Sequence, residues 1–112
     1  MMPYHNRHFR AVSNSDNGEV DRQTTFHYRQ QDNILWATYK GTNIRFGTIT
    51  GIVHEDGRLI FTYQHLNQDN DFMTGRCESR PEELPNGKIR LHESWQWTCA
   101  DFSKGESIVE EI

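Results

Sequence analysis

The stretch Ile44–Leu66, IRFGTITGIVHEDGRLIFTYQHL, contains the clearest hairpin signal in the chain. Its segments Ile44–Val53 and Arg58–Leu66 carry apolar residues at alternating positions and flank the dipeptide Asp56-Gly57. Alternation with period two is typical of β-strands, and Asp-Gly between such runs favours a two-residue hairpin turn. The stretch is therefore predicted to form a pair of antiparallel strands.

Short alternating segments separated by turn signals continue in both directions from this hairpin. They predict about eight strands with these approximate limits: Arg7–Ser13, Thr24–Gln31, Ile34–Lys40, Ile44–Val53, Arg58–Leu66, Phe72–Ser79, Lys88–Cys99 and Glu106–Ile112. The connection before Lys88 is expected to be longer because it contains Pro81 and Pro85. These prolines limit Glu78–Leu84 to a helical turn at most.

Short connections between the strands decide the fold class. Parallel crossover units need about a dozen residues or more between strands, so the pattern predicts antiparallel pairing. Without helices to cover a sheet, closing the sheet on itself buries its apolar face and removes both edges. We therefore expect an all-β fold, an eight-stranded antiparallel up-and-down barrel, with a two-sheet sandwich as the alternative. The 112 residues fit one domain, 1–112, in which residues 1–6 are expected to be flexible.

Composition limits the partners of this domain. Twelve Lys and Arg against sixteen Asp and Glu give a net charge of −4, which provides no general attraction to nucleic acid or to an anionic membrane. The chain has no long apolar run that would span a membrane, and Met1–His8 lacks the apolar stretch of a secretory signal. Cys77 and Cys99 are too few for a disulfide scaffold. A cytoplasmic protein with free thiols is expected.

Turn length determines which residues face each other across a hairpin. A two-residue loop at Asp56-Gly57 would place Ile52 opposite Phe61 and Thr50 opposite Tyr63. Combined with the neighbouring segments, this register predicts an inner face consisting of Phe26, Tyr28, Leu35, Ala37, Tyr39, Ile44, Phe46, Thr48, Thr50, Ile52, Leu59, Phe61 and Tyr63.

A second two-residue loop, Asp32-Asn33, would pair Gln31 with Ile34. The opposite face is then polar and includes His27, Arg29, Lys40, Arg45 and Gln64. Trp36 falls on this polar side. Either the register differs there by one residue, or Trp36 marks a contact surface between subunits.

The segment Lys88–Cys99 places a carboxylate inside the barrel. Its inward positions are Ile89, Leu91, Glu93, Trp95 and Trp97. Burial of a carboxylate is costly unless the group is paired or hydrogen-bonded. Glu93 therefore either forms an internal salt bridge or a Tyr–Glu hydrogen bond, or lines a ligand cavity. The expected register puts Gly75 opposite Glu93, which would leave space beside the carboxylate.

Patterns for other chemistry are weaker. The six histidines lie on different segments without the spacing of metal ligands, so they are expected to be solvated, and neither a metal nor another cofactor is expected. No helix start or basic cluster lowers the pKa of Cys77, which favours a small buried residue over a nucleophile. No second inward carboxylate accompanies Glu93 for acid–base hydrolysis. No catalytic residue is assigned.

Several runs of the sequence are distinctive: Phe26–Gln30 (FHYRQ), Leu35–Gly41 (LWATYKG), Ile44–Thr48 (IRFGT), Arg90–Trp97 (RLHESWQW) and Gly105–Ser107 (GES). Together they resemble a family of small bacterial avidin-like barrel proteins that are often labelled N-acetylglutamate synthase. The resemblance covers approximately Arg7–Ile112 and implies an avidin-like, calycin-like barrel. The label implies acetyl transfer, but the sequence lacks the Gln/Arg-x-x-Gly-x-Gly/Ala turn that holds the CoA pyrophosphate at a helix start. The biotin contacts of avidin cannot be matched to this chain residue by residue.

The sequence thus predicts a non-enzymatic barrel that binds a small ligand at one open end. The expected ligand-binding residues are Tyr28, Tyr39, Tyr63, Glu93, Trp95 and Trp97. The alternative is a structural or interaction module, such as a homo-oligomer contacting through Trp36, whose barrel is filled by its own side chains. A cavity on the order of a few hundred cubic ångströms beside Glu93 would favour ligand binding, and a packed interior would favour the alternative. An acetyltransferase is the least supported function.

Overall fold

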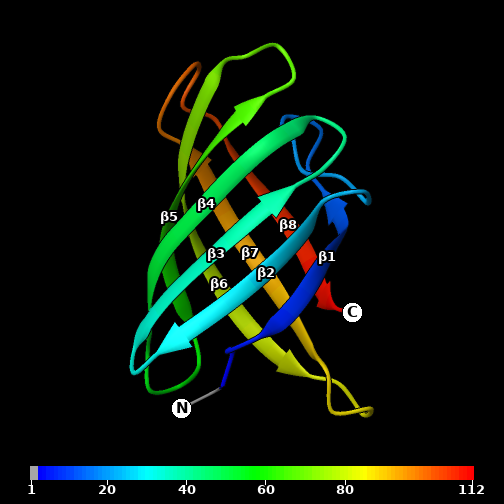
Figure 1. The fold of residues 1–112 in the computed structure, drawn as a ribbon, viewed down its shortest axis with the longest axis vertical. Coiled ribbons are helices and arrows are strands. Elements are labelled where there is room, and N and C mark those ends of the chain that lie inside the picture. Colours follow the sequence, from blue (N-terminus) through cyan, green and yellow to red (C-terminus); the bar gives the residue numbers. More distant parts are fainter. Residues whose placement is uncertain (1–2) are drawn as a thin grey trace.

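A computed structural model describes residues 3–112, so Met1 and Met2 lie outside the described residues. The strands are β1 (Arg7–Asn14), β2 (Thr25–Gln31), β3 (Ile34–Lys40), β4 (Ile44–Val53), β5 (Leu59–Asn67), β6 (Phe72–Glu83), β7 (Ile89–Trp97) and β8 (Lys104–Glu111). Each strand pairs antiparallel with the next, and β8 pairs with β1 (Figure 1). The predicted eight-stranded up-and-down barrel is confirmed. Residues 3–112 include no helix, and hence none long and apolar enough to cross a membrane.

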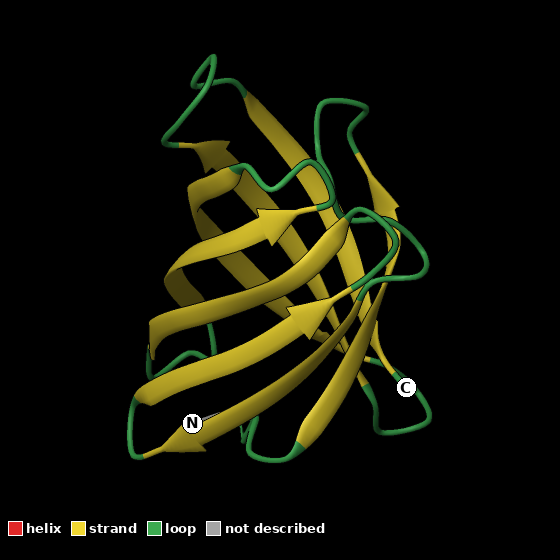
Figure 2. Ribbon diagram, turned by 45° about the horizontal axis from the view of Figure 1, so that its top comes forward, coloured by secondary structure: helices red, strands yellow, loops and turns green. Residues whose placement is uncertain are grey.

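The connections gather at the two ends of the barrel (Figure 2). One end, called here the mouth, consists of residues 15–24, 41–43, 68–71 and 98–103. The other end, called the base, consists of residues 32–33, 54–58 and 84–88 together with the start of the chain. This alternation follows from the topology, because consecutive antiparallel strands run in opposite directions.

The β2–β3 hairpin has the predicted register. Gln31 pairs with Ile34 across the loop Asp32-Asn33, and the pairing continues without a shift along both strands. Trp36 therefore lies on the outer face, where 36% of its surface is exposed. The alternative of a one-residue difference in register at this tryptophan is excluded.

The β4–β5 turn differs from the prediction. The His54 N–H donates to the Arg58 carbonyl (2.8 Å) and the Gly57 N–H to the His54 carbonyl (2.9 Å), so the loop has three residues instead of two. Gly57 adopts a φ of 90°, the left-handed conformation that such a loop needs at its last position. Consequently Gly51 lies opposite Phe61.

A β-bulge between Ile44 and Phe46 reverses the facing of most of β4. Ile44 points inward as predicted, but beyond the bulge the buried positions are those of Ile49 and Val53. The residues wrongly predicted to point inward are Phe46, Thr48, Thr50 and Ile52. One extra residue moves every later side chain of a strand to the other face, and the local alternation does not reveal where it is inserted.

Strand β6 continues through Pro81 where the sequence predicts a helical turn at most. Pro81 pairs with Leu91 of β7 and lies beyond the last residue of β6 that pairs with β5, Ser79. β6 is therefore an edge at this point, and a sheet edge tolerates proline. The short turn at 84–88 places Ser79 opposite Glu93, so the predicted pairing of Gly75 with Glu93 is wrong.

Side chains fill the base of the barrel. Those that are fully buried there include Tyr4, Phe9, Tyr28, Leu35, Val53, Leu59, Ile89, Leu91 and Val109. The Tyr4 hydroxyl donates to the Gly57 carbonyl (2.6 Å), and the Tyr4 N–H donates to Gln30 Oε1 (2.8 Å). Tyr4, which belongs to the segment 1–6 that the sequence predicts to be flexible, is thus buried in the base with both of these contacts.

Candidate functional site

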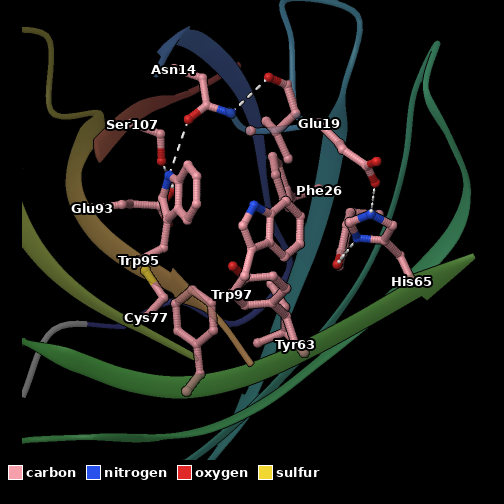
Figure 3. Close-up of a pocket in the computed structure, with 15 residues that line it drawn as sticks. Asn14, Glu19, Phe26, Tyr63, His65, Cys77, Glu93, Trp95, Trp97 and Ser107 are labelled. Carbon is pink, nitrogen blue, oxygen red and sulfur yellow. Dashed lines mark hydrogen bonds and ion pairs between the residues drawn. The ribbon is translucent and has the colours of Figure 1, made fainter. Parts of the chain in front are cut away.

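A cavity of about 50 Å³ lies between the filled base and the mouth (Figure 3). Its wall is mainly aromatic and consists of Phe26, Tyr39, Phe61, Tyr63, Trp95 and Trp97. A space of this size holds a few water molecules. It is smaller than the roughly 300 Å³ or more of most ligand pockets. The interior is therefore neither hollow nor completely packed in this conformation.

The two tryptophans of β7 form one wall of the cavity. The ring centroids of Trp95 and Trp97 are 5.4 Å apart, with their planes inclined by 62°. Trp95 Nε1 donates to Asn14 Oδ1 (3.0 Å), and Trp97 Nε1 donates to the Asn17 carbonyl (3.0 Å). Both indole N–H groups thus hold the end of β1 and the β1–β2 connection, while the rings face the cavity.

Glycines on neighbouring strands make room for the rings. A Cβ added to any of three glycines would collide with the aromatic side chain opposite it. The pairs are Tyr39 with Gly47, Tyr63 with Gly75, and Trp95 with Gly105. Glycine in a strand often marks such a close approach. These glycines let the rings lie closer to the barrel wall and so leave the cavity open.

Glu93 lies on the inner face between two serines of the adjacent strands. Ser79 and Ser107 are its register partners on β6 and β8. Ser107 Oγ donates to Glu93 Oε1 (2.9 Å), and Ser79 Oγ to Oε2 (3.4 Å). Burial raises the pKa of Glu93 to about 7, although both serine hydrogen bonds act in the opposite direction. The predicted salt bridge or Tyr–Glu bond is not present among residues 3–112, and serine hydroxyls take its place.

Below Glu93, toward the base, lies the fully buried Tyr28, packed against Phe9 at a centroid distance of 4.7 Å. Its hydroxyl has no hydrogen-bond partner among the residues that the structure describes. Burial raises the pKa of Tyr28, and the charge of Glu93 raises it further. A buried donor without a partner is uncommon.

The family can be assigned once the barrel and its interior are described. A family model described as avidin-like protein matches residues 2–112. The chain belongs to the avidin-like family. Comparison with curated proteins and with solved structures gave no match. Membership of this family agrees with the closed barrel of this avidin-like protein. The ligand is therefore inferred from the cavity.

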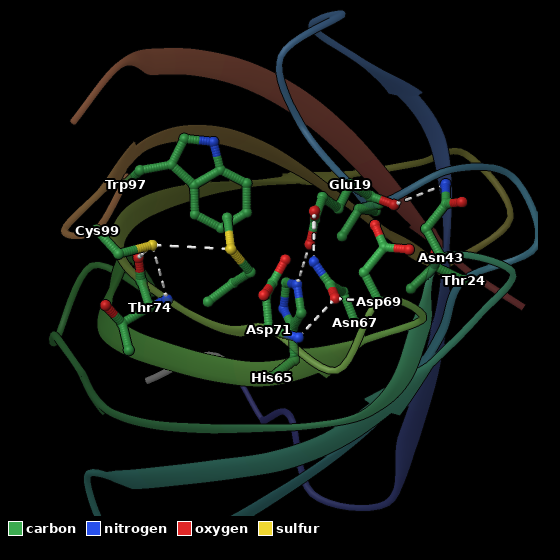
Figure 4. Close-up of polar contacts among 12 residues, drawn as sticks. Glu19, Thr24, Asn43, His65, Asn67, Asp69, Asp71, Thr74, Trp97 and Cys99 are labelled. Carbon is green, nitrogen blue, oxygen red and sulfur yellow. Dashed lines mark hydrogen bonds and ion pairs between the residues drawn. The ribbon is translucent and has the colours of Figure 1, made fainter. Parts of the chain in front are cut away.

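A partly buried hydrogen-bond chain joins the mouth of the avidin-like barrel to its wall, and Figure 4 labels its members Glu19, His65 and Asn67. The Tyr39 hydroxyl lies 2.8 Å from His65 Nδ1, and His65 Nε2 lies 2.7 Å from Glu19 Oε1. Because a carboxylate only accepts, Nε2 carries the proton and Nδ1 accepts from the tyrosine. Asn67 Nδ2 donates to Glu19 Oε2 (3.1 Å). Glu19, in the β1–β2 connection, is thereby tied to β5.

The prediction of a solvated His65 is wrong, because only 4% of its surface is exposed. His65 follows Phe61 and Tyr63 at alternate positions of β5, so the strand period itself indicates an inward side chain. No group of His, Cys, Asp and Glu within residues 3–112 is arranged to hold a metal ion. The buried histidine serves the β1–β2 connection instead.

Five of the six residues predicted for the site line the cavity of this avidin-like protein: Tyr39, Tyr63, Glu93, Trp95 and Trp97. Tyr28 lies deeper. The residues of β1 and the β1–β2 connection that line the cavity were not predicted: Asn14, Gly18, Glu19 and Val20. A connection has no periodicity that predicts which way its side chains point. Nothing in the sequence therefore indicates that these residues lie over the mouth.

Proposed function

We propose that this avidin-like barrel binds a small molecule in the cavity beside Glu93, Trp95 and Trp97. The observation that carries the proposal is an aromatic-walled space with one carboxylate, placed directly beneath a surface connection. Ligand sites typically combine apolar walls with a few oriented polar groups. The aromatic rings would supply most of the contact area, and Glu93 would orient the ligand.

The β1–β2 connection, residues 15–24, would act as the lid of this site. It is held over the mouth by polar contacts: Trp97 Nε1 to the Asn17 carbonyl, Glu19 to His65, and Asn14 Nδ2 to the Val20 carbonyl (2.9 Å). Val20 of the connection also packs against the core, so lifting the connection would expose some apolar surface. Binding loops are commonly regions of low local stability. Lifting the connection would enlarge the cavity for a ligand.

We propose no catalytic step at this site. Burial and the charge of Glu93 raise the pKa of Cys77, so the thiol stays protonated at neutral pH and is a poor nucleophile. Acetyl transfer remains the least supported function, since residues 3–112 contain no helix start to hold a CoA pyrophosphate. The free thiols Cys77 and Cys99 fit a reducing compartment, and we propose the cytoplasm.

A fragment titration tests ligand binding. Uncharged, anionic and cationic compounds of up to about eight non-hydrogen atoms would be added to ¹⁵N-labelled protein, with the indole N–H signals of Trp95 and Trp97 as reporters. Trp36, on the outer face, provides an internal control. We expect some fragments to shift both inner signals while leaving Trp36 unchanged, and Trp95→Ala to abolish binding in a folded protein. Failure of every fragment to shift the inner signals would refute the proposal.

A second function, an interaction module, is favoured by the outer surface of β3–β5. Lys40 and Arg45 are also exposed there, at the mouth end; the remaining outward residues, which we call the uncharged face, are Ile34, Trp36, Thr38, Phe46, Thr48, Thr50, Ile52, Ile60, Thr62, Gln64 and Leu66. Ile34, Ile52 and Ile60 are register neighbours and are 52%, 51% and 39% exposed. An exposed apolar row of this kind is typical of an interaction site.

We propose that a second copy of this chain covers the uncharged face. A two-fold contact would place Ile and Thr rows against each other with no like charges opposed, as a self-complementary interface requires. Arg29 and Arg76 flank the face on β2 and β6, beside Trp36 and Thr62. We expect sedimentation to show a dimer that Ile52→Lys dissociates and that Ile108→Lys, on the outer face of β8, leaves intact. A monomeric native protein would exclude this second function.

A further inference from the structure

The cavity contains a carboxylate without a counter-charge. The groups that face Glu93 from the surrounding strands are neutral: Ser79 and Cys77 from β6, Ser107 from β8, Tyr28 from β2, Tyr39 from β3, and Tyr63 from β5. The acidic residue of the mouth that lines the cavity, Glu19, already pairs with His65. No Lys or Arg among the described residues forms an ion pair with Glu93. An ionised carboxylate in such surroundings is strongly disfavoured unless a cation joins it.

The rings that line the cavity together with this carboxylate form an angular box. The centroids of Trp95 and Trp97 are 5.4 Å apart, those of Trp97 and Tyr63 5.9 Å, and those of Tyr63 and Phe61 6.4 Å. Successive ring planes are inclined by 62–64°. Ring faces at this inclination can contact one occupant from several sides. Aromatic faces carry negative charge density and attract cations, most strongly those of tryptophan.

We propose that the ligand of this cavity is a small organic cation, an alkylammonium group held by the aromatic box with the Glu93 carboxylate as its counter-ion. The inference rests on the proposed ligand-binding function and specifies its substrate class. An ammonium N–H would donate to a Glu93 lone pair that the serine hydroxyls leave free. The Tyr28 hydroxyl, which lacks a partner, provides a further donor near the ionised carboxylate.

The size of the cavity limits the bound group. About 50 Å³ accommodates a headgroup of roughly three or four non-hydrogen atoms, such as trimethylammonium. A longer substituent would leave through the mouth, past the β1–β2 connection. An anionic ligand would be opposed by Glu93, and an uncharged ligand would leave the carboxylate unpaired.

Binding of the cation should depend on pH. Burial raises the pKa of Glu93 to about 7, and only the ionised form is a counter-ion. The facing groups Tyr28, Tyr39, Tyr63 and Cys77 have raised pKa values and stay neutral through this range. Because trimethylammonium is charged throughout, its affinity should be about 30-fold higher at pH 8 than at pH 5.5, following the ionised fraction of Glu93.

The experiment compares a cation with an uncharged molecule of similar shape. Trimethylammonium chloride and tert-butyl alcohol are titrated into labelled protein at constant ionic strength, with the indole signals of Trp95 and Trp97 as reporters and Trp36 as the reference. We expect trimethylammonium to bind with the stated pH dependence and Glu93→Gln to weaken it at least tenfold at pH 8. Ser107→Ala, which keeps the carboxylate, should still bind the cation.

The outcomes separate this inference from the proposed function. If tert-butyl alcohol binds as tightly as trimethylammonium, or if the cation binds equally at both pH values, the substrate class is wrong while ligand binding stands. If no compound shifts the inner signals, both proposals fail. The pH comparison uses the native chain, so the inference stays testable even if Glu93→Gln does not fold.

Discussion

Glu93 is the residue at which stability and ligand binding oppose each other. Burial raises its pKa from 4.5 to about 7, so the ionised form is disfavoured in the folded protein by about 3 kcal/mol. In the unfolded chain the carboxyl group ionises near its ordinary pKa. The stability linked to Glu93 is therefore fully present below about pH 4.5 and is lost as the pH rises through about 7.

Glu93→Gln should remove this pH dependence. Relative to the native protein, we expect the variant to gain stability between pH 4.5 and pH 7, with a difference approaching about 3 kcal/mol above pH 8. Urea unfolding at several pH values measures it, because the contributions of all other groups cancel in the comparison. Glu106→Gln, on the outer face of the next strand, is the matched control. A difference between variant and native protein that does not change with pH would contradict the raised pKa.

Gly105→Ala tests the close contact beneath Trp95. The added methyl group would collide with the indole ring, so Trp95 has to move into the cavity. We expect a loss of about 1–3 kcal/mol in unfolding free energy, as for other overpacked interiors, and a shifted Trp95 indole signal. Glu106→Ala, at the adjacent outward position, serves as control. If the variant keeps its full stability and the Trp95 indole signal does not shift, the barrel wall, and not the ring, moves to accommodate the added methyl group.

At the scale of elements, the β1–β2 connection differs from the other connections of the mouth. It reaches over the cavity and is bonded to β5, to β7 and, through Ser15 and Asn17, to β8, whereas it adds no strand of its own to the barrel. Closure therefore depends on these polar contacts and on the packing of Val20, and each hydrogen bond contributes roughly 1 kcal/mol, or more when a charged group takes part. This balance suits an element that opens while the barrel stays folded.

Glu19→Ala should release this connection. Loss of the Glu19–His65 contact (2.7 Å) leaves a buried histidine donor unpaired, which we expect to favour the open form by about tenfold. Faster hydrogen exchange of the Trp97 indole N–H, which is bonded to the Asn17 carbonyl, would report the opening. Glu55→Ala, in the β4–β5 turn at the base, is the control. Unchanged exchange in Glu19→Ala would mean that the connection does not act as a lid.

For the whole molecule, the seam between β8 and β1 closes the barrel. Its inner side contains the buried Phe9, Ala11 and Val109, and at its base end Arg7 forms an ion pair with Glu111 (2.7 Å). Partly exposed ion pairs contribute about 0–1 kcal/mol, whereas removing buried methyl groups has a larger effect. Closure should therefore depend on apolar packing more than on charge.

Paired substitutions at the seam measure this difference. We expect Val109→Ala to reduce the unfolding free energy by about 2 kcal/mol, and Arg7→Ala to reduce it by less than about 1 kcal/mol. Urea unfolding followed by circular dichroism provides both values. An Arg7→Ala effect equal to or larger than that of Val109→Ala would show that the ion pair closes the barrel.

Local alternation was sufficient to predict the barrel and much of its interior. On β7 the period-two pattern placed Glu93, Trp95 and Trp97 inside, where they line the cavity. On β2 and β3 the two-residue loop set the register, which the structure confirms. Both inferences depend on neighbouring residues only, since side chains alternate along any extended strand.

Three features could not be derived in this way. The bulge after Ile44 and the three-residue turn at Gly57 each change a residue count, and a single residue reverses the facing of a strand. The continuation of β6 through Pro81 depends on β5 ending earlier, which is a property of the neighbour. These positions are decided by the fit of whole strands around a closed barrel.

The sequence by itself determined the strand class, the order of the strands and the burial of an acid among tryptophans, because these follow from short-range periodicity. Only the tertiary structure decided which groups contact each other: two serines form hydrogen bonds with Glu93, and glycines lie beneath the aromatic rings. It also placed Glu19 over the mouth, in contact with His65. Such contacts join residues far apart in the chain, and their geometry exists only after the sheet has closed.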